Sequence, residues 1–149
     1  MVRRLMATTG RWEFTVLRLA VGIMILPHGL QKVFGIWGGA GLVGIMSFFT
    51  NVVHIPAWLG YIVIATEVVG GAALILGVLA RVAAFFVSCE MVGAALLVHR
   101  PNGFFMNWEA HLPAGAEGFE FHILVVAILV AVMIGGAGAA SIDGAVSGS

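Results

Sequence analysis

Four long apolar stretches, at roughly 13–34, 57–78, 82–99 and 119–138, constrain most strongly what this chain can fold into. Each is close to the roughly 20 residues that an α-helix needs to cross a lipid bilayer. The sequence therefore predicts an all-α, single-domain membrane protein built as a four-transmembrane-helix bundle. A Gly/Ala/Ser-rich tail at about 139–149 is expected to be loose.

Charged residues are too scarce to cover a surface that faces water. They make up 9% of the 149 residues, whereas a soluble domain carries about 25%. We therefore expect membrane lipid around most of the surface. The net charge is zero and no basic block is present, so no nucleic-acid partner is expected. The single cysteine, Cys89, lies in an apolar run, and we expect it to be a small buried residue.

The positive charges suggest which side of the membrane each loop occupies. Arg18 lies inside the first stretch, and the other six divide four to two between the sides. The four are Arg3, Arg4, Arg11 and Arg81, and the two are Lys32 and Arg100. Since loops rich in Lys and Arg favour the cytoplasm, both termini are predicted to be cytoplasmic. The four tryptophans fall at or just beyond the ends of the stretches, as an interfacial aromatic belt requires.

The loop between the first two stretches is itself apolar and has a helical period. Its apolar residues repeat every three or four positions, which predicts a helix at about 40–53 that is too short to span. These residues are Leu42, Ile45, Met46, Phe49, Val52 and Val53. We expect an interfacial or re-entrant helix over the outer end of the bundle. A plain connector lying on the membrane surface fits the pattern equally well.

Three charged residues, Arg18, Glu67 and Glu90, lie inside the first three stretches. A charge at the bilayer centre costs at least about 2.5–3.5 kcal/mol, so we expect all three to face inward and pair. Each shares a helical face with small residues, which mark packing faces in membranes. These small residues are Gly22, Gly29, Gly60, Gly71, Gly93 and Ala94. We predict an Arg18–Glu67/Glu90 cluster in the core, which is either an ion pair that fixes helix register or a site for protons or a ligand.

By this topology most histidines and several acids gather on the outer side, many of them in "HRPNGFFMNWEAHLPAGAEGFEFH". His28, His99 and Glu120 are candidates for exchanging protons with a ligand, and Phe104 for lining an apolar slot. The alternative is that these residues only solvate a loop at the membrane surface. For the acids and histidine in the middle of the loop, Glu109, His111 and Glu117, that alternative is favoured.

A quinone or another amphipathic aromatic molecule is the ligand that best suits an apolar slot with a few polar groups. Imidazole and carboxylate side chains also bind metals. However, the two Glu-x-His pairs of the loop lack the i, i+3 or i, i+4 spacing that puts two ligands on one helical face. Haem held between His28 and His99 is geometrically conceivable but less well supported. We therefore expect no metal site and no haem, with a quinone as the candidate cofactor.

Five segments in order resemble the DoxX family of small bacterial membrane proteins. They are "LRLAVGIMILPHGLQKVFG", "ATEVVGGAALILGVLARVAA", "HRPNGFF", "GAEGFEFH" and "GAGAASID". Together they cover roughly residues 14–143. The resemblance singles out Arg18, Gly22, His28, Gly29, Lys32, Glu67, Gly71, Arg81, His99, Gly103, Phe104, Gly118, Glu120 and Asp143.

The resemblance implies a four-helix bundle in the bacterial inner membrane and a redox context. The family is associated with terminal oxidases, thiosulfate:quinone oxidoreductase, oxidative-stress complexes and resistance to aromatic compounds. The first hypothesis is therefore a component of a quinone-linked membrane oxidoreductase, working with other membrane subunits. The second is a non-catalytic accessory subunit that packs against a larger complex. The third is a carrier of protons or small molecules that uses the predicted Arg18–Glu67/Glu90 cluster.

Overall fold

The computed structural model describes residues 5–113 and 115–148, and every regular element within them is helical. The elements are α2 (Trp12–Phe34), η1 (Ile36–Gly38), α3 (Gly41–Asn51), α4 (Ala57–Ala65), η2 (Thr66–Gly70), α5 (Gly71–Leu76), α6 (Ala80–Ala94), η3 (Ala95–His99), η4 (Arg100–Asn102), α7 (Glu120–Gly135) and α8 (Ile142–Ser147). Of these, η2 and η3 are π-helical turns inside longer helices. The all-α prediction is confirmed for the described residues.

Three helical runs in the described part of the chain are long and apolar enough to cross a membrane. They are Trp12–Phe34, Ala57–Leu76 and Ala80–Asn102, and they correspond to the first three predicted stretches. The fourth prediction, 119–138, contains α7, which has only 16 residues. Such a helix is about 24 Å long, whereas the hydrocarbon core of a bilayer is about 30 Å thick. Helix length therefore establishes three candidate spans.

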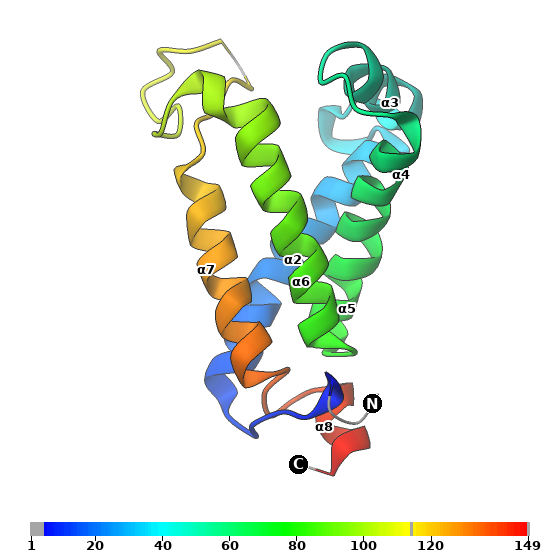
Figure 1. Ribbon diagram of the computed structural model, residues 1–149, viewed down its shortest axis with the longest axis vertical. Helices are drawn as coiled ribbons and strands as arrows, with labels where there is room; N and C mark the ends of the chain where they lie inside the picture. Colours follow the sequence, from blue (N-terminus) through cyan, green and yellow to red (C-terminus); the bar gives the residue numbers. More distant parts are fainter. Residues whose placement is uncertain (1–4, 114, 149) are drawn as a thin grey trace.

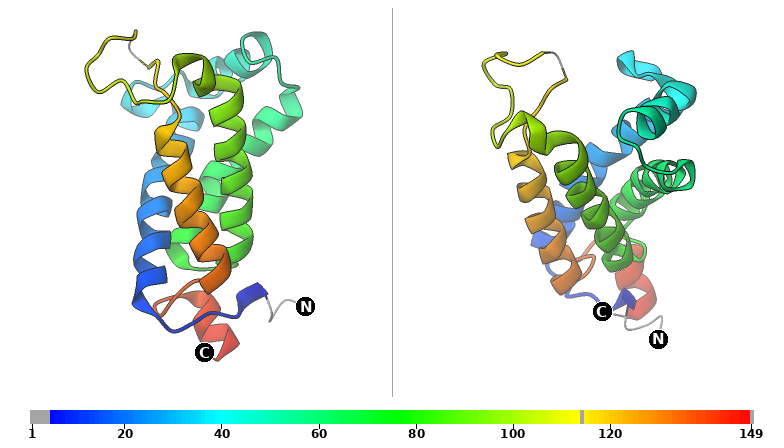
Figure 2. Two further views of the ribbon diagram at one scale, coloured as in Figure 1. Left: turned by 60° about the vertical axis from the view of Figure 1, so that its left-hand side comes forward. Right: turned by 45° about the horizontal axis from the view of Figure 1, so that its top comes forward.

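The helices form two arms that meet at one end of the molecule, the closed end, and diverge toward the other, the open end (Figures 1 and 2). One arm consists of α6 and α7, which pack along each other, and the other arm carries α3 and α4. α2 contacts α5, η2 and α7 and so connects the arms. α8 lies at the closed end, and the loop before α7 lies at the open end.

A core of buried apolar side chains joins α2, α5, α6 and α7. It includes Val21, Ile25, Leu74, Ala84, Val87, Met91, Val125, Leu129 and Val132. α6 contributes along most of its length, whereas η3, which continues it toward the open end, has no buried residue, so the core lies toward the closed end. The open end is left without a packed centre, and this is where the arms separate.

Glycines allow α2 and α5 to approach closely, as the predicted packing faces require. A Cβ atom on Gly22 would lie 2.8 Å from Cγ1 of Ile75, and one on Gly71 would lie 2.9 Å from the backbone nitrogen of Leu26. Both glycines are buried. The predicted small-residue faces of the first two spans thus pack against each other, a pairing that the sequence did not specify.

Arg18 is 1% exposed and donates its hydrogen bonds to backbone carbonyls at the end of α5 and in the segment that follows α7. Nε lies 2.7 Å from the oxygen of Ala137, and Nη1 lies 2.7 Å from that of Leu74 and 2.6 Å from that of Ile75. Nη2 donates to Ala140. The last carbonyls of a helix lack partners within the helix and carry partial negative charge. The guanidinium therefore ties the end of α5 to the segment that follows α7.

These contacts correct the prediction that Arg18 pairs with Glu67 and Glu90. Side chains on an α-helix tilt toward its N-terminus, and the N-terminus of α2 lies at the closed end. The Arg18 side chain therefore extends away from both glutamates. The acid that acts on Arg18 electrostatically is Asp143. Lys32, in the last turn of α2, is the residue that pairs with Glu67.

The C-terminal tail, predicted to be loose, instead forms α8 and docks at the closed end. Asp143 is 1% exposed. Its carboxylate accepts hydrogen bonds from the backbone N–H groups of Leu79 at 2.7 Å and Ala80 at 2.9 Å, at the start of α6. Ser141 caps α8 by accepting from the N–H of Gly144 at 3.0 Å. These polar bonds do not depend on hydrophobic periodicity, which is why an apolar-pattern search missed the helix.

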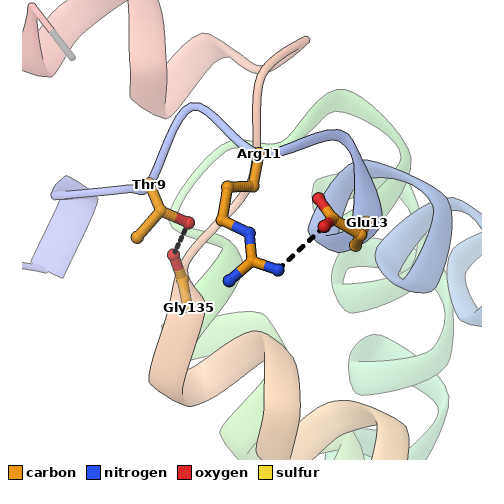
Figure 3. A network of polar contacts seen from close by, with 4 residues as sticks. All are labelled: Thr9, Arg11, Glu13 and Gly135. Carbon is orange, nitrogen blue, oxygen red and sulfur yellow. Dashed lines mark hydrogen bonds and ion pairs between the residues drawn. The ribbon is translucent and has the colours of Figure 1, made fainter.

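The segment before α2 is also tied to the closed end. The backbone N–H and the hydroxyl of Thr9 both donate to the carbonyl oxygen of Gly135, each at 3.1 Å, and Figure 3 shows the hydroxyl bond. Arg11 and Glu13 form a neighbouring ion pair at 2.8 Å that is largely exposed (Figure 3). The hydrogen bonds of Thr9 therefore hold the segment before α2 against the C-terminal end of α7.

α3 confirms that the loop between the first two spans contains a short helix within the predicted 40–53. Its residue Phe49 is 7% exposed and packs beside Gly60 in α4. A Cβ atom added to Gly60 would lie 2.9 Å from Cδ2 of Phe49. The four tryptophans are each more than 60% exposed and lie near helix ends or in the loop before α7. Their positions fit the predicted interfacial belt.

Candidate functional site

A cavity of about 720 Å³ lies between the two arms. Its walls come from α2, α3, α4 and η2 on one side and from α6, η3 and α7 on the other. Most of the lining is apolar, with aromatic rings from Phe48, Phe86 and Phe121. This volume falls within the range of roughly 300–1,000 Å³ that is typical of small-molecule pockets.

Lys32 and Glu67 form an ion pair in the cavity wall. The ammonium of Lys32, in the last turn of α2, donates to Oε1 of Glu67 in η2. The Glu67 side chain is only 4% exposed, and that of Lys32 is 23% exposed. A buried carboxylate needs such a partner, because an unpaired charge in an apolar interior is strongly disfavoured.

Glu90 brings a second carboxyl group to the same place. It projects from α6 into the cavity and interacts electrostatically with both Glu67 and Lys32. Among the described residues, the Oε2 atoms of Glu67 and Glu90 are buried without a hydrogen-bond partner. One ammonium thus faces two carboxyl groups, and the two carboxyl groups also face each other.

His99 and His122 form a second polar group in the cavity wall, on the arm of α6 and α7. Their ring centroids are 4.3 Å apart. Nδ1 of His99 lies 2.8 Å from the carbonyl oxygen of Glu117, so this nitrogen carries the proton. His122 is 8% exposed, and within the described chain its Nδ1 has no hydrogen-bond partner. His122 therefore offers a buried nitrogen to the cavity.

His28 completes the polar lining on the α2 side, one turn before Lys32. The predicted candidates His28 and His99 thus reach the same cavity from opposite arms. Two π-helical turns help to place the polar groups, since η2 carries Glu67 and η3 carries His99. π-Helical turns are rare and occur often at functional sites, because the extra residue shifts which side chains face inward.

Glu120 and Phe104, the other two predicted candidates, are not among the residues that line this cavity. Oε1 of Glu120 accepts hydrogen bonds from the backbone N–H of Met106 at 3.0 Å and from Nε1 of Trp108 at 2.8 Å. Phe104 packs its ring against Phe119, with centroids 5.4 Å apart. Both residues organise the loop that leads into α7, and the geometry gives them no contact with a ligand in the cavity.

The small-residue face of α6 also differs from the prediction. Glu90, Gly93 and Ala94 line the cavity and do not form a packing face against another helix. A Cβ atom added to Gly93 would meet nothing within 4 Å. α6 packs instead through its buried residues Ala84 and Val87. Small residues here leave space for an occupant, and sequence alone does not distinguish that use from close helix packing.

The middle of the loop before α7 lies outside the cavity, apart from Glu117. Glu109 and His111 pair at 2.7 Å, and both side chains are 79% exposed. Glu117 lines the cavity, while its carboxylate accepts a hydrogen bond from the N–H of Asn107 at 2.6 Å. Cys89, predicted to be buried, is exposed and lines the cavity as well.

No metal-binding group is found in the described part of the chain: nowhere do three or more His, Cys, Asp or Glu side chains come close enough together to hold an ion. His99 and His122 are adjacent, but a zinc site takes three or four protein ligands. The polar groups of the cavity therefore comprise Lys32 with two acids, the adjacent imidazoles of His99 and His122, and His28.

Two residues of the site, Lys32 and His122, were not predicted as ligand or charge-cluster residues, although the DoxX resemblance singled out Lys32. A signal for each was present in the sequence. Lys32 follows His28 by four residues, which places both on one helical face. His122 precedes Val125 and Leu129 by three and seven residues, which is the buried face of α7. Reading the helical register of the polar residues would have found both.

Comparison with known proteins agrees with this architecture. The sequence model of the DoxX family matches residues 14–100. The chain belongs to the DoxX family. The match confirms the resemblance expected from the motifs, and it includes the cavity residues of α2, η2, α6 and η3 but not His122.

A similar curated protein is the "Putative oxidoreductase CatD" of Bacillus subtilis (strain 168). The two are 26% identical over 116 residues, which cover 78% of this chain and 75% of that protein. No solved structure matches the chain. DoxX membership together with the three long apolar helices makes this a membrane-embedded protein in contact with lipid.

Proposed function

We propose that this DoxX-family protein is a component of a redox-active membrane complex and that its cavity binds a quinone-like molecule. The carrying observation is the cavity itself, about 720 Å³, apolar over most of its wall, with buried polar groups on both arms. A quinone is likewise mostly apolar, with a ring and tail that carry only two polar oxygens. Aromatic and aliphatic walls with a few polar groups are typical of sites for such molecules.

The polar groups supply the chemistry that a quinone-like molecule needs. Lys32 can donate hydrogen bonds, carboxyl groups can accept them, and His28, His99 and His122 can do either according to tautomer. Imidazole and carboxyl groups also exchange protons, which accompanies reduction and oxidation of quinones. The name of the similar protein in Bacillus subtilis, an oxidoreductase, supports the redox assignment.

We further propose that α7 is a fourth span, that the protein lies in the bacterial inner membrane, and that both termini are cytoplasmic. α7 packs against α6 and runs in the opposite direction, from the open end back to the closed end. Arg11 and Arg81 lie at the closed end, where Arg81 donates to the carbonyl oxygen of Ala7 at 3.2 Å. Positive charge at the closed end supports placing that end in the cytoplasm. Arg3 and Arg4 lie outside the described residues.

Other membrane subunits are proposed as partners. Large apolar side chains, among them Val16, Ile23 and Phe85, are exposed on the outer faces of α2 and α6, and either lipid or another subunit can cover them. If the chain is instead a non-catalytic accessory subunit, the same exposed faces bind the larger complex, and the cavity needs no ligand. Gentle extraction of the protein with its partners, followed by mass spectrometry, identifies the partner subunits. A measurement of ligand binding distinguishes the quinone-binding component from the accessory subunit.

The binding test uses purified protein in lipid nanodiscs and a decyl-substituted benzoquinone. Gly93→Leu places a side chain in open space inside the cavity, so the fold is retained. We expect the wild-type protein to bind the quinone and Gly93→Leu to bind it at least about tenfold more weakly, a loss of about 1.4 kcal/mol. The matched control is Gly10→Leu, which also meets open space but lies outside the cavity.

Size-exclusion chromatography checks that both variants remain folded. Wild-type protein that binds no quinone, or a Gly93→Leu variant that binds it as tightly as Gly10→Leu does, would contradict the proposed function. The first result would favour the accessory role.

A further inference from the structure

The cavity has an opening on one side of the protein, between α4 and α6. Three residues that line the cavity, Ile62 of α4, Phe86 of α6 and Leu97 of η3, are also 48%, 52% and 56% exposed. A side chain that faces both the cavity and the outside lies at the rim of an opening. Cys89 and Gly93 continue the rim, since with Phe86 and Leu97 they follow the i, i+3, i+7 and i+11 spacing of one helical face.

Helix packing explains where this opening ends. The main contacts of α4 are with α2, α3 and η2, whereas α6 contacts η2 and α5 from the other arm. Gly70 of η2 lies against α6, because a Cβ atom added to it would be 3.0 Å from Cγ2 of Val87. The arms are therefore in contact from η2 toward the closed end, and they separate along α4 (Figure 1).

The position of the rim along the spans places the opening within the membrane. Ile62 lies five residues after the start of the span Ala57–Leu76, and Leu97 lies five residues before the end of the span Ala80–Asn102. At 1.5 Å per residue, both are about 7–8 Å along their helices from the open end. The hydrocarbon core of a bilayer is about 30 Å thick. The opening therefore faces hydrocarbon, in the half of the bilayer nearer the open end.

The chemistry of the rim suits an apolar molecule. Ile62, Phe86 and Leu97 present only hydrocarbon to their surroundings, whereas the exposed lining residue on the α2 side is His28. A quinone with an alkyl tail dissolves in the bilayer and not in water, so an apolar opening toward lipid is the one that it meets. The polar groups of the cavity lie farther in, and Glu67 among them is only 3% exposed.

We infer that the ligand enters and leaves the cavity sideways from the lipid, through the opening between α4 and α6. The inference rests on the proposed function, since it takes a quinone-like molecule as the ligand. It adds that the ligand is one dissolved in the membrane, and it assigns Ile62 and Leu97 to the entrance.

The test measures the rates of quinone binding by stopped-flow tryptophan fluorescence on the full-length protein in nanodiscs. The probe is a decyl-benzoquinone with every ring position substituted, so that it does not add to the thiol of Cys89. Ile62→Trp narrows the opening. We expect its association and dissociation rate constants both to fall at least about tenfold and its Kd to stay within about threefold, because an entrance residue changes the barrier to passage and not the bound state.

Two further tryptophan variants give the comparison. Val69→Trp is the matched control, because Val69 is 67% exposed on the same span but does not line the cavity. It has the same number of tryptophans as Ile62→Trp and so reports quenching by quinone that is free in the bilayer. Val53→Trp obstructs the cavity near the open end instead. Both variants should bind the quinone at wild-type rates.

The outcomes separate the entrance from the proposed function. Wild-type rates for Ile62→Trp, slower binding for Val53→Trp alone, or a weaker Kd for Ile62→Trp at an unchanged association rate would each overturn the inference and leave the proposed function standing. Absence of quinone binding by the wild-type protein overturns both. Leu97→Trp makes the same test from the opposite side of the opening if Ile62→Trp fails to fold.

Discussion

At the scale of single residues, helix direction decided what the intramembrane charges do. Arg18 and Lys32 lie on the same helix, and both side chains tilt toward its N-terminus. Arg18 therefore reaches helix-end carbonyls at the closed end, while Lys32 reaches inward to Glu67. The sequence showed that three charges must be accommodated in the bundle, but the partners follow from the position of each charge along α2.

Removing the Arg18 guanidinium should destabilise the protein without a direct effect on ligand affinity. Arg18→Ala leaves several buried carbonyls without a charge-assisted donor, each worth about 1.5–3 kcal/mol. We expect a loss of at least about 3 kcal/mol, seen as a lower melting temperature in detergent, and a smaller loss for Arg18→Lys. Arg11→Ala is the control, because Arg11 is exposed. An Arg18→Ala protein that melts with the wild type would contradict the clamp role.

At the scale of elements, α8 shows that a short helix can have a structural function that hydropathy does not reveal. Its residue Asp143 supplies two acceptors to the first N–H groups of α6, which have no partner within the helix. Leu79, at the N-cap position of α6, has a φ of 46°, a left-handed conformation that is unfavourable for leucine. The carboxylate therefore stabilises a tight turn as well as a helix end.

Asp143→Asn should weaken this junction. An amide offers one acceptor oxygen in place of two and removes the negative charge from the N-terminus of α6. We expect a loss of about 1–2 kcal/mol in the free energy of unfolding, as for the loss of a helix cap. Thermal melting of the purified protein measures it, with Glu13→Gln as the exposed control. No difference between the two variants would mean that the docked tail is dispensable.

At the scale of the whole molecule, the divergence of the arms creates the cavity. The core holds α2, α5, α6 and α7 together toward the closed end, and α3 contributes Phe48 and Phe49 to the cavity wall. The predicted helix at 40–53 thus forms part of the wall, near the open end.

The proposed four-span topology predicts which sites a membrane-impermeant maleimide reaches in intact cells. With Cys89 replaced by serine, Glu109→Cys should be labelled from outside. Gly10→Cys and Ala145→Cys should be labelled only after the membrane is permeabilised, since α7 would return the chain to the inner side. These positions are exposed. Labelling of Ala145→Cys in intact cells would limit the protein to three spans.

Sequence by itself determined the properties that depend on composition and local period. Few charges and long apolar stretches indicated a helical membrane protein, and small residues at helical spacing marked the packing faces of the first two spans. The sequence motifs identified the DoxX family, which the family model confirms. His28 and His99 were predicted to lie on one side of the membrane, because a topology places helix ends together, and both line the cavity.

Only the tertiary structure decided which polar groups share a site. Glu67 and Glu90 lie on different helices, and their distance from Lys32 depends on how far the arms diverge. Glu120 and Phe104 resemble site residues in sequence, but the loop turns them toward its own backbone and rings. Helical period places residues on a face, whereas packing decides whether that face meets a helix, lipid or a cavity, and for Gly93 and Glu90 it meets the cavity.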